Sequence, residues 1–182
     1  MKIKNFKSYN GARDKINRLG LRPLVSELLR LIRGTRIFLL EKKDANGGKE
    51  VRVALDGAFT EKGGWGKNVV GDIDWIKDAK FNDKVVSRLG VEVQVSARSD
   101  LVIRDLIHLR NNLQCGKIDV GIIVVPTDLM SVFLPDRTPS FSQTVRYIEI
   151  EFREAEFFPL ILIGVEHDGP SDKPLPKQRR RA

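Results

Sequence analysis

The pattern of apolar and polar residues predicts helix in two parts of the chain. Apolar residues recur at helical spacing through residues 11–34, where Pro23 is placed to begin the better helical piece and Gly34 to end it. The clearest helical pattern lies between Ser99 and Gly116, where successive apolar residues are four, three and four positions apart. Serine is a favoured N-cap and glycine a favoured residue just past a helix end, so we expect the helix to span these two residues.

Two nearly continuous apolar runs predict strands that are buried on both faces. They are KIDVGIIVVP at 117–126 and FPLILIGV at 158–165. The segment KVVSRLGVEVQV, at 84–95, predicts two further strand pieces around a turn near 88–90. A strand, a helix and a buried strand in this order imply an α/β fold with a right-handed crossover, in which helices flank a central mixed sheet.

The intervening segments lack a helical pattern. Residues 35–40 are β-branched and aromatic, and a turn signal at 46–48 precedes the alternating run VRVAL at 51–55, so a β-hairpin is predicted here. Residues 60–75 are rich in glycine and polar side chains, which predicts a long loop with short strand fragments.

The length of 182 residues fits one domain with a substantial core. We assign that domain to residues 1–167, with an N-terminal helical part at 11–34 and a core at 51–165. Residues 168–182 have no apolar pattern and are predicted to form a disordered basic tail.

The composition is that of a soluble globular protein, with 41% apolar and 31% charged residues. Collagen-like, disordered and disulfide-scaffold classes are therefore excluded. The single cysteine, Cys115, excludes an internal disulfide and a multi-cysteine zinc module. The charged first ten residues have no apolar stretch of the signal-peptide kind, and no apolar run is long enough to span a bilayer. We expect a soluble, cytoplasmic protein with no membrane partner.

The formal net charge of +8 is concentrated at the two ends of the chain. Residues 1–36 carry ten Lys and Arg against two acids, and the last ten residues carry five basic side chains and no acid. Residues 37–172 hold 17 basic and 22 acidic side chains. Basic segments bind polyanions by releasing counterions from phosphates, although a solvated helix face explains the charge as well.

The run VEVQV, at 91–95, is the part of the sequence most suggestive of chemistry. Residues two apart on a strand share a face, so Glu92 and Gln94 point one way and the three valines point into the core. Packing alone does not explain a carboxylate and an amide on such a strand. If the preceding piece pairs with this strand as a hairpin, Asp83 returns to the same end as Glu92. Two carboxylates there would form an oxygen-ligand site for Mg²⁺.

The residues Asp83, Glu92 and Gln94, in the pattern D-x8-E-x-Q, resemble the active site of the PD-(D/E)XK nucleases. Glutamine in place of the commoner lysine is the variant found in type II restriction endonucleases of the BglII/BstYI-like group. The similarity extends to three more segments in the same order, namely ALDGAF (54–59), KIDVG (117–121) and PLILIG (159–164).

This resemblance implies a restriction-endonuclease-like core and a specific reaction. A homodimer would cleave double-stranded DNA at a short palindromic site, with one active site per strand and Mg²⁺ as cofactor, and leave 5′-phosphate ends. It also implies a prokaryotic cell that holds a cognate DNA methyltransferase.

The resemblance further assigns roles to individual residues. Asp83 and Glu92 would bind the metal, with the Val93 carbonyl as a further ligand. Gln94 would orient the attacking water or contact phosphate, and because an amide carries no charge, the metal must supply more of the electrostatic stabilisation. Residues just after E-x-Q approach the base edges in relatives, which nominates Ser96 and Arg98 as DNA-binding residues.

Several acids compete for these roles. Asp56 is a candidate third carboxylate near the phosphate, and a loop or cap role explains it equally well. Asp72, Asp74 and Asp78 are rivals to the metal-binding aspartate if the hairpin is placed differently. His108 is expected to be a surface or interface histidine and not a general base.

Three other functions remain open from the sequence. One is a repair, nicking or junction-resolving nuclease of the same superfamily, which would lack a fixed cleavage site. Another is a non-catalytic DNA-binding module that uses the basic ends. The third is a metal-dependent nucleotide hydrolase, against which the absence of a P-loop sequence counts modestly.

Overall fold

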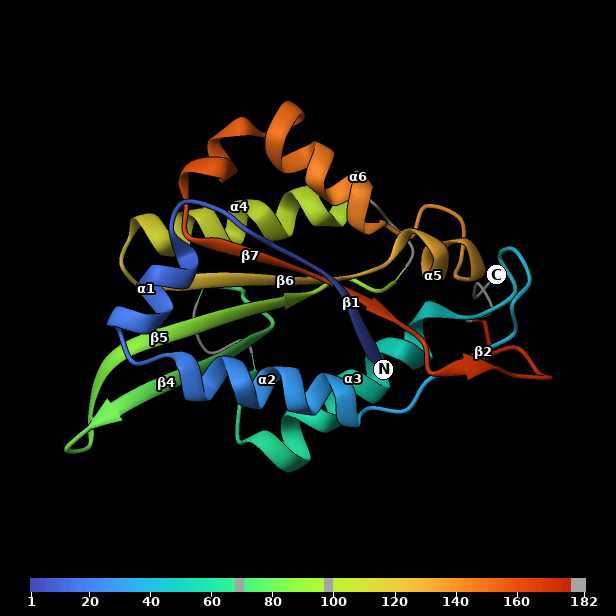
Figure 1. Ribbon diagram of the computed structural model, residues 1–182, viewed down its shortest axis with the longest axis horizontal. Coiled ribbons are helices and arrows are strands. Elements are labelled where there is room, and N and C mark those ends of the chain that lie inside the picture. Colours follow the sequence, from blue (N-terminus) through green and yellow to red (C-terminus); the bar gives the residue numbers. More distant parts are fainter. Residues whose placement is uncertain (68–70, 97–99, 178–182) are drawn as a thin grey trace.

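The computed structural model describes residues 1–67, 71–96 and 100–177. Within them, six strands form one mixed sheet, and helices cover both of its faces (Figure 1). In their order across the sheet the strands are β1 (Lys2–Ser8), β7 (Leu160–Glu166), β6 (Val120–Pro126), β5 (Lys84–Val93), β4 (Trp75–Phe81) and β3 (Gly66–Lys67).

The helices form a layer on each side of this sheet, as Figure 1 shows. Two further short strands, β2 (Phe38–Leu39) and β8 (Gly169–Pro170), pair in parallel outside the sheet. The helices are α1 (Ala12–Arg18), α2 (Arg22–Gly34), α3 (Gly48–Gly63), α4 (Asp100–Gln114), α5 (Asp128–Phe133) and α6 (Phe141–Arg146), followed by a π turn (Tyr147–Glu151) and a 3-10 turn (Arg153–Phe157).

The centre of the sheet has the predicted strand–helix–strand order. Strands β5, β6 and β7 are parallel, and α4 connects β5 to β6. Strand β4 is antiparallel to β5, and β1 is antiparallel to β7. Every residue of β6 and β7 is buried, as their continuous apolar sequences predict. The expected α/β fold with a central mixed sheet is therefore confirmed.

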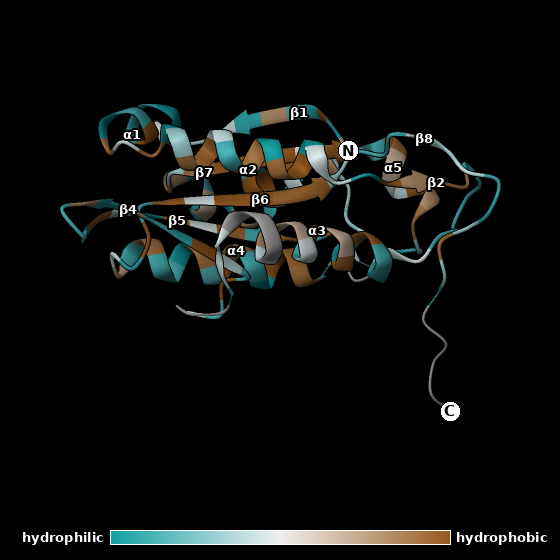
Figure 2. Ribbon diagram, turned by 90° about the horizontal axis from the view of Figure 1, so that it is seen from below, coloured by the Kyte–Doolittle hydropathy of each residue, from teal (hydrophilic) through white to brown (hydrophobic). Residues whose placement is uncertain are grey.

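The core lies on both faces of the sheet, so the molecule has three layers. Leu28 of α2 and Phe59 of α3 pack with Val91 and Val93 of β5 on one face. On the opposite face Leu106 of α4 belongs to a second buried cluster that includes alternate residues of β6 and β7. Figure 2 shows that β6 and β7 are largely apolar, and Figure 1 shows them between the two helical layers.

The helix predictions at 11–34 and at 99–116 are confirmed in their main parts. Pro23 lies in the first turn of α2. Gly116 adopts a positive φ of 63° just past α4, and its N–H donates to Leu113 O at 3.2 Å. Ser99, the expected N-cap, lies outside the described residues.

The hairpin predicted across residues 35–55 is wrong, because residues 48–63 form α3. The alternating run VRVAL is only five residues long, which is too short to distinguish the period of a strand from that of a helix. Val51, Leu55 and Phe59 lie four positions apart on one face of α3, and all three are fully buried. Val53, between two of them, is 52% exposed.

The turn predicted near 88–90 is also absent, and β5 runs unbroken from Lys84 to Val93. Gly90 lies within the strand, and this position is a glycine because neighbouring side chains fill the space that a larger side chain would need. A Cβ at Gly90 would approach Ile118 Cδ1 to 2.9 Å. Arg88 pairs with Asp78 on β4, at 2.5 Å between Nε and Oδ1. The glycine thus marks a close approach within a strand and not a turn.

Two segments near the ends of the chain have structure that the sequence did not predict. Strand β1 lies at the edge of the sheet, beside β7. Residues 168–177, predicted to be part of a disordered tail, are docked on the body. Leu175 accepts a hydrogen bond from Gly47 N–H at 3.0 Å and donates its own N–H to Asn46 Oδ1 at 3.1 Å. The remainder of the predicted tail, 178–182, lies outside the described residues.

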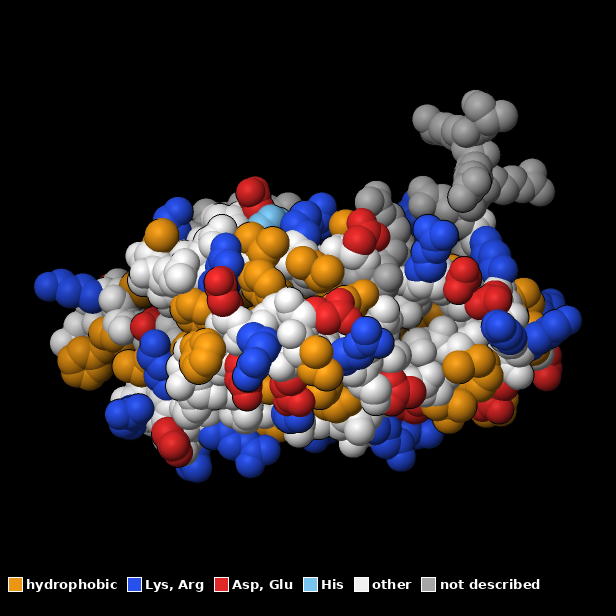
Figure 3. Space-filling view, turned by 90° about the horizontal axis from the view of Figure 1, so that it is seen from above, with side chains coloured by type: hydrophobic (Ala, Val, Ile, Leu, Met, Phe, Trp, Pro, Cys, Tyr) orange, Lys and Arg blue, Asp and Glu red, His pale blue; other side chains and the backbone are white. Residues whose placement is uncertain are grey.

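Among the described residues no helix is both long enough and apolar enough to cross a membrane. The face that carries α4 and α6 shows acidic, basic and apolar side chains interspersed, without one dominant charge (Figure 3).

Candidate active site

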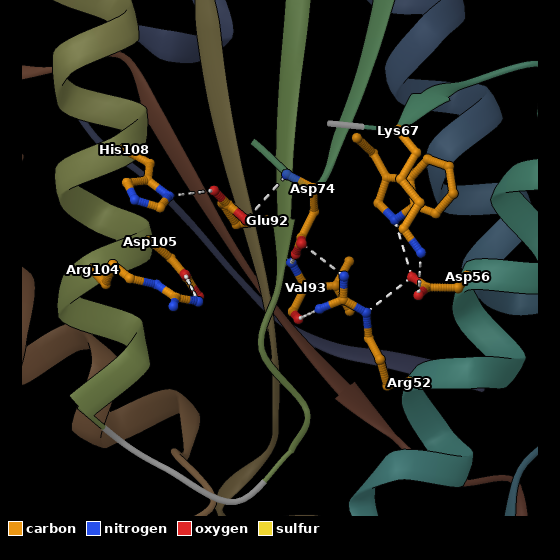
Figure 4. Close-up of polar contacts among 10 residues, drawn as sticks. Arg52, Asp56, Lys67, Asp74, Glu92, Val93, Arg104, Asp105 and His108 are labelled. Carbon is orange, nitrogen blue, oxygen red and sulfur yellow. Dashed lines mark hydrogen bonds and ion pairs between the residues drawn. The ribbon is translucent and has the colours of Figure 1, made fainter. Parts of the chain in front are cut away.

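The candidate site lies where the end of β5 meets the start of β4. Glu92 and Gln94 are only 2% and 3% exposed, although both are polar. The neighbouring valines, Val91 and Val93, pack in the cluster on the α3 side of the sheet. Glu92 points the other way, toward α4, where its Oε1 lies 3.6 Å from His108 Nδ1 (Figure 4). The strand therefore presents a buried carboxylate to α4.

Asp74, directly before β4, is the aspartate that the structure brings to Glu92. Its backbone N–H donates to Glu92 Oε2 at 3.3 Å, and its Oδ2 accepts from Val93 N–H at 2.9 Å. Strand pairing explains the contact, because Trp75 lies opposite Val91 and the preceding residue therefore lies opposite Glu92.

The expected approach of Asp83 to Glu92 is wrong. Asp83 is exposed in the turn of the β4–β5 hairpin, directly after Asn82, and both residues have positive φ values, of 61° and 47°. The last pair of the ladder is Phe81 with Lys84. From Lys84 to Glu92 the chain advances eight residues, or about 26 Å at roughly 3.3 Å per residue. Asp83 and Glu92 thus lie at opposite ends of the hairpin.

The other two rival acids are placed elsewhere. Asp72 is exposed and has a positive φ of 60°, and Asp78 is paired with Arg88. The loop that contains Asp72 is fastened to α4, because Asn112 Nδ2 donates to Gly71 O at 3.0 Å. A Cβ at Gly71 would lie 1.9 Å from Asn112 Oδ1, so glycine permits this contact and helps to fix the chain just before Asp74.

Arg52 of α3 joins three groups on the other side of β5. Its guanidinium lies 2.7 Å from Asp74 Oδ1, 2.9 Å from Asp56 Oδ1 and 2.5 Å from the Val93 carbonyl oxygen (Figure 4). These contacts raise the pKa of Arg52 despite its burial. The guanidinium shows that Asp74 and the Val93 carbonyl together accept a cation.

Asp56 is an interior residue of α3 and not a loop or cap residue. Besides Arg52, it accepts hydrogen bonds from Lys67 Nζ at 3.0 Å and from Trp75 Nε1 at 3.1 Å. Its carboxylate therefore reaches the site through Arg52, and its other partners hold it against β3 and β4.

On the α4 side, Asp105 and His108 extend the group of ionisable residues around Glu92. The two are three positions apart, so they lie on one face of the helix. One ligand atom from each of Glu92, Asp105 and His108 can be chosen so that all three lie within 4.8 Å of one another. The sequence did not predict this contact, because His108 was expected to lie at the surface or at an interface. The signal that could have found it is the spacing of the two polar residues on the helix face that also carries Val102 and Leu109.

Burial and mutual repulsion shift the pKa values of these acids. Burial, reinforced by the charges of Asp74 and Asp105, raises the pKa of Glu92 to about 10. Burial and Asp74 raise the pKa of Asp105 to about 7, against the opposing effect of Arg104 and Arg52. Burial opposes ionisation of Asp74 too, but the hydrogen bond and charge of Arg52 and the Val93 N–H hold its pKa below the usual range. Ionisation of Glu92 and Asp105 is thus opposed in the metal-free site, and a cation between them would favour their ionised forms.

The remaining predicted residues lie just beyond the strand. Gln94 Nε2 donates to the Ser96 carbonyl at 3.3 Å, and Ser96 is half-buried. A Cβ at Gly48 would lie 2.8 Å from the Val95 carbonyl oxygen, so the start of α3 packs closely against this segment. Arg98 lies outside the described residues.

Comparison with known proteins identifies one family. A family model described as restriction endonuclease BglII/BglIII matches residues 4–165, which include all of the elements that form the site. No curated protein matches the chain significantly.

Proposed function

Because the chain belongs to the BglII/BglIII restriction endonuclease family, we propose that it is a Mg²⁺-dependent type II enzyme that cuts double-stranded DNA at one short palindromic site. Membership of this family makes it a nuclease that acts on the phosphodiester bonds of DNA. The dependence on Mg²⁺, the single site and the 5′-phosphate ends are the proposed refinements.

The observation that carries the proposal is the meeting of Asp74 and Glu92 beside Val93, whose carbonyl contacts the same guanidinium as Asp74. Carboxylate and carbonyl oxygens are the ligands that Mg²⁺ prefers, usually with substrate phosphate and water. Arg52 supports the fit, because its cationic guanidinium already lies against Asp74 and the Val93 oxygen. Asp74, Glu92 and the Val93 carbonyl would hold the metal. When bound, the metal would supply a more acidic water and polarise the scissile phosphate.

The protein's own groups would position the reactants. Gln94 lies at the end of the same strand, two residues past Glu92, and its amide can donate a hydrogen bond to a phosphate oxygen or to the attacking water. It cannot supply positive charge. Arg52 supplies a positive charge 2.7 Å from Asp74, and we assign it the neutralisation of Asp74 and of the phosphate that approaches it.

The proposal includes a homodimer and a partner activity in the cell. A palindromic site has two-fold symmetry, which a symmetric dimer with one active site per strand matches. A cell that contains such an enzyme protects its own sites by methylation, so a cognate DNA methyltransferase is expected. We also propose Ser96 and Arg98 as the residues that approach the bases, since they directly follow the catalytic strand.

The test is cleavage of phage DNA by the purified protein, with Mg²⁺ and with EDTA, followed by sequencing of the fragment ends. Discrete Mg²⁺-dependent fragments with one shared terminal sequence are expected. A smear would instead identify a nuclease without a fixed site. DNA that is retarded on a gel but never cut would indicate a DNA-binding module without nuclease activity.

Three matched variants locate the site. Asp74→Asn and Glu92→Gln should each reduce cleavage at least about 100-fold while DNA binding stays measurable, because each removes a proposed metal ligand. Asp83→Asn makes the same chemical change at the hairpin turn and should leave the rate within about twofold. If Asp83→Asn were inactive and Asp74→Asn active, the assignment of Asp74 would be overturned.

A further inference from the structure

We propose that Glu92, Asp105 and His108 form a second cation site, on the α4 side of Glu92, that takes a divalent ion of the Zn²⁺ class. It differs from the proposed Mg²⁺ position, which lies on the Asp74 side. Glu92 would belong to both, because Oε2 faces the Asp74 N–H while Oε1 faces His108. The inference concerns metal binding and does not depend on cleavage of DNA.

The three donor residues are held close together by the fold. Glu92 is fixed at the end of β5, and Asp105 and His108 come from one face of α4, so two rigid elements hold the three donors. Their donor atoms lie within 4.8 Å of one another (Figure 4). Ions of the Zn²⁺ class bind nitrogen and oxygen ligands at about 2.0–2.2 Å, so donors around one ion lie within a few ångströms of each other.

The cluster contains two buried oxygens that lack a hydrogen-bond partner among the described residues. Glu92 Oε1 and Asp105 Oδ2 are buried and accept no hydrogen bond from the residues that the structure describes. The side chains of Glu92 and Asp105 are only 2% and 4% exposed. A buried acceptor without a hydrogen bond destabilises the folded protein, and more so if the acceptor is charged. A cation between α4 and β5 would satisfy both oxygens at once.

The other histidine of the chain shows what a satisfied pair looks like. His167 Nε2 lies 3.2 Å from Glu166 Oε1, so it also faces a buried carboxylate. Here, however, Glu166 Oε1 accepts a hydrogen bond from the backbone N–H of His167, and Glu166 Oε2 accepts one from the Thr127 hydroxyl. Glu166 therefore has no free oxygen to offer, whereas Glu92 has one.

The donor set determines the class of ion. Mg²⁺ favours oxygen ligands in near-octahedral geometry and retains several waters. An imidazole nitrogen combined with two carboxylates suits ions such as Zn²⁺, which bind both donor types. His108 is partly exposed, with 24% of its side chain accessible, which leaves a route for an ion to enter.

The chain itself provides the probe, because His108 and His167 are its only histidines. The experiment records the imidazole ¹⁵N resonances of the full-length, DNA-free protein during titration with ZnCl₂, and separately with MgCl₂. We expect Zn²⁺ to shift His108 Nδ1 strongly and Mg²⁺ to leave it unchanged. His167 serves as the internal reference and should not move with either ion.

Variants separate this site from the proposed Mg²⁺ position. Asp105→Asn should weaken the Zn²⁺ affinity about tenfold or more, because it removes a ligand without changing the side-chain size. Asp74→Asn should retain the Zn²⁺ shift of His108 even if it abolishes cleavage. His108→Gln, followed by calorimetry, provides a second measurement if Asp105→Asn does not fold.

The results decide the matter in either direction. An unmoved His108 resonance in the folded wild-type protein at saturating Zn²⁺ would overturn the second site. Zn²⁺ binding that is unchanged by both Asp105→Asn and His108→Gln would do the same, as would equal shifts at both histidines. A lack of cleavage by a protein that still shows the specific His108 shift would refute only the proposed nuclease function.

Discussion

Arg52 is the residue that connects the two sides of the candidate site. Its side chain is 23% exposed, and it serves two carboxylates and a backbone carbonyl at once. Without it, Asp74 would lose the ion pair at 2.7 Å that offsets the nearby carboxyl groups of Glu92 and Asp56. The arginine is thus required both for the stability of the metal-free protein and for the placement of Asp74.

Arg52→Ala should lower the free energy of unfolding by about 1–3 kcal/mol, measured by urea denaturation in EDTA. The reason is that Asp74 and Asp56 lose a shared, partly buried donor. Arg36→Ala is the matched control, because Arg36 is 74% exposed and pairs with one acid only. Its effect should stay below about 1 kcal/mol. Equal losses in the two variants would contradict the structural role of Arg52.

Asp74 is the residue of the candidate site that the sequence did not identify as the partner of Glu92. The sequence identified Glu92 and Gln94 from their alternation with valines, because that period is a local property of one strand. It could not locate the turn of the hairpin, which determines which upstream acid returns to Glu92. A spacing of nine residues favoured Asp83, whereas β4 and β5 pair over a longer stretch and bring back Asp74.

At the scale of elements, the structure agrees with the sequence wherever a pattern is long. Helices α2 and α4 and strands β6 and β7 each carry an unbroken apolar pattern over seven or more residues. Elements without such a pattern were missed or misassigned, whatever their length. Strand β1 mixes lysines with apolar residues because it lies at the sheet edge, and α3 begins with a run that also fits a strand. Tertiary packing decides such cases.

The pairing of β2 with β8 depends on a carboxylate just before β8. Asp168 Oδ2 accepts from the Ile37 N–H at 2.9 Å, and Arg36 and the Met1 amino group pair with the same side chain at 3.2 and 3.0 Å. Burial would raise the pKa of Asp168, but the Ile37 hydrogen bond and these positive charges hold it below the usual value of 3.8.

Asp168→Asn should therefore lower the free energy of unfolding by about 1–3 kcal/mol at pH 7. A depressed pKa in the folded state contributes stability above the unfolded-state value, and this contribution is lost as the pH falls through the folded-state value. The difference between wild type and variant should accordingly shrink below about pH 4. Urea titrations at pH 7 and pH 3 measure it, with the exposed Asp172→Asn as control. A difference that is independent of pH would exclude the ionic contribution.

At the scale of the whole molecule, the positive charge is concentrated at the two ends of the chain. The acids of the site come from the segment between these ends. The docking of residues 168–177 changes how this charge should be tested. Removal of the last ten residues would delete Leu175, which hydrogen-bonds Gly47 and Asn46. Loss of binding in such a variant would mix structural damage with loss of charge.

Residues 178–182 hold three arginines and can be tested separately. Replacement of these arginines by glutamine should weaken DNA binding to a similar extent for all sequences. The slope of log affinity against log salt should fall by about 0.9 for each arginine that contacts a phosphate. Fluorescence anisotropy at several salt concentrations measures this slope. An unchanged slope would show that these residues do not contact the DNA backbone.

The end of α4 offers a means to measure the assembly itself. Cys115 is exposed, directly follows the helix, and is the only cysteine of the chain. It lies seven residues beyond His108, or about 10 Å along a helix. A spin label can therefore be attached to Cys115 without the replacement of any other cysteine. In a symmetric pair of chains it would yield one label-to-label distance, and that distance would report how the two active sites are spaced on DNA.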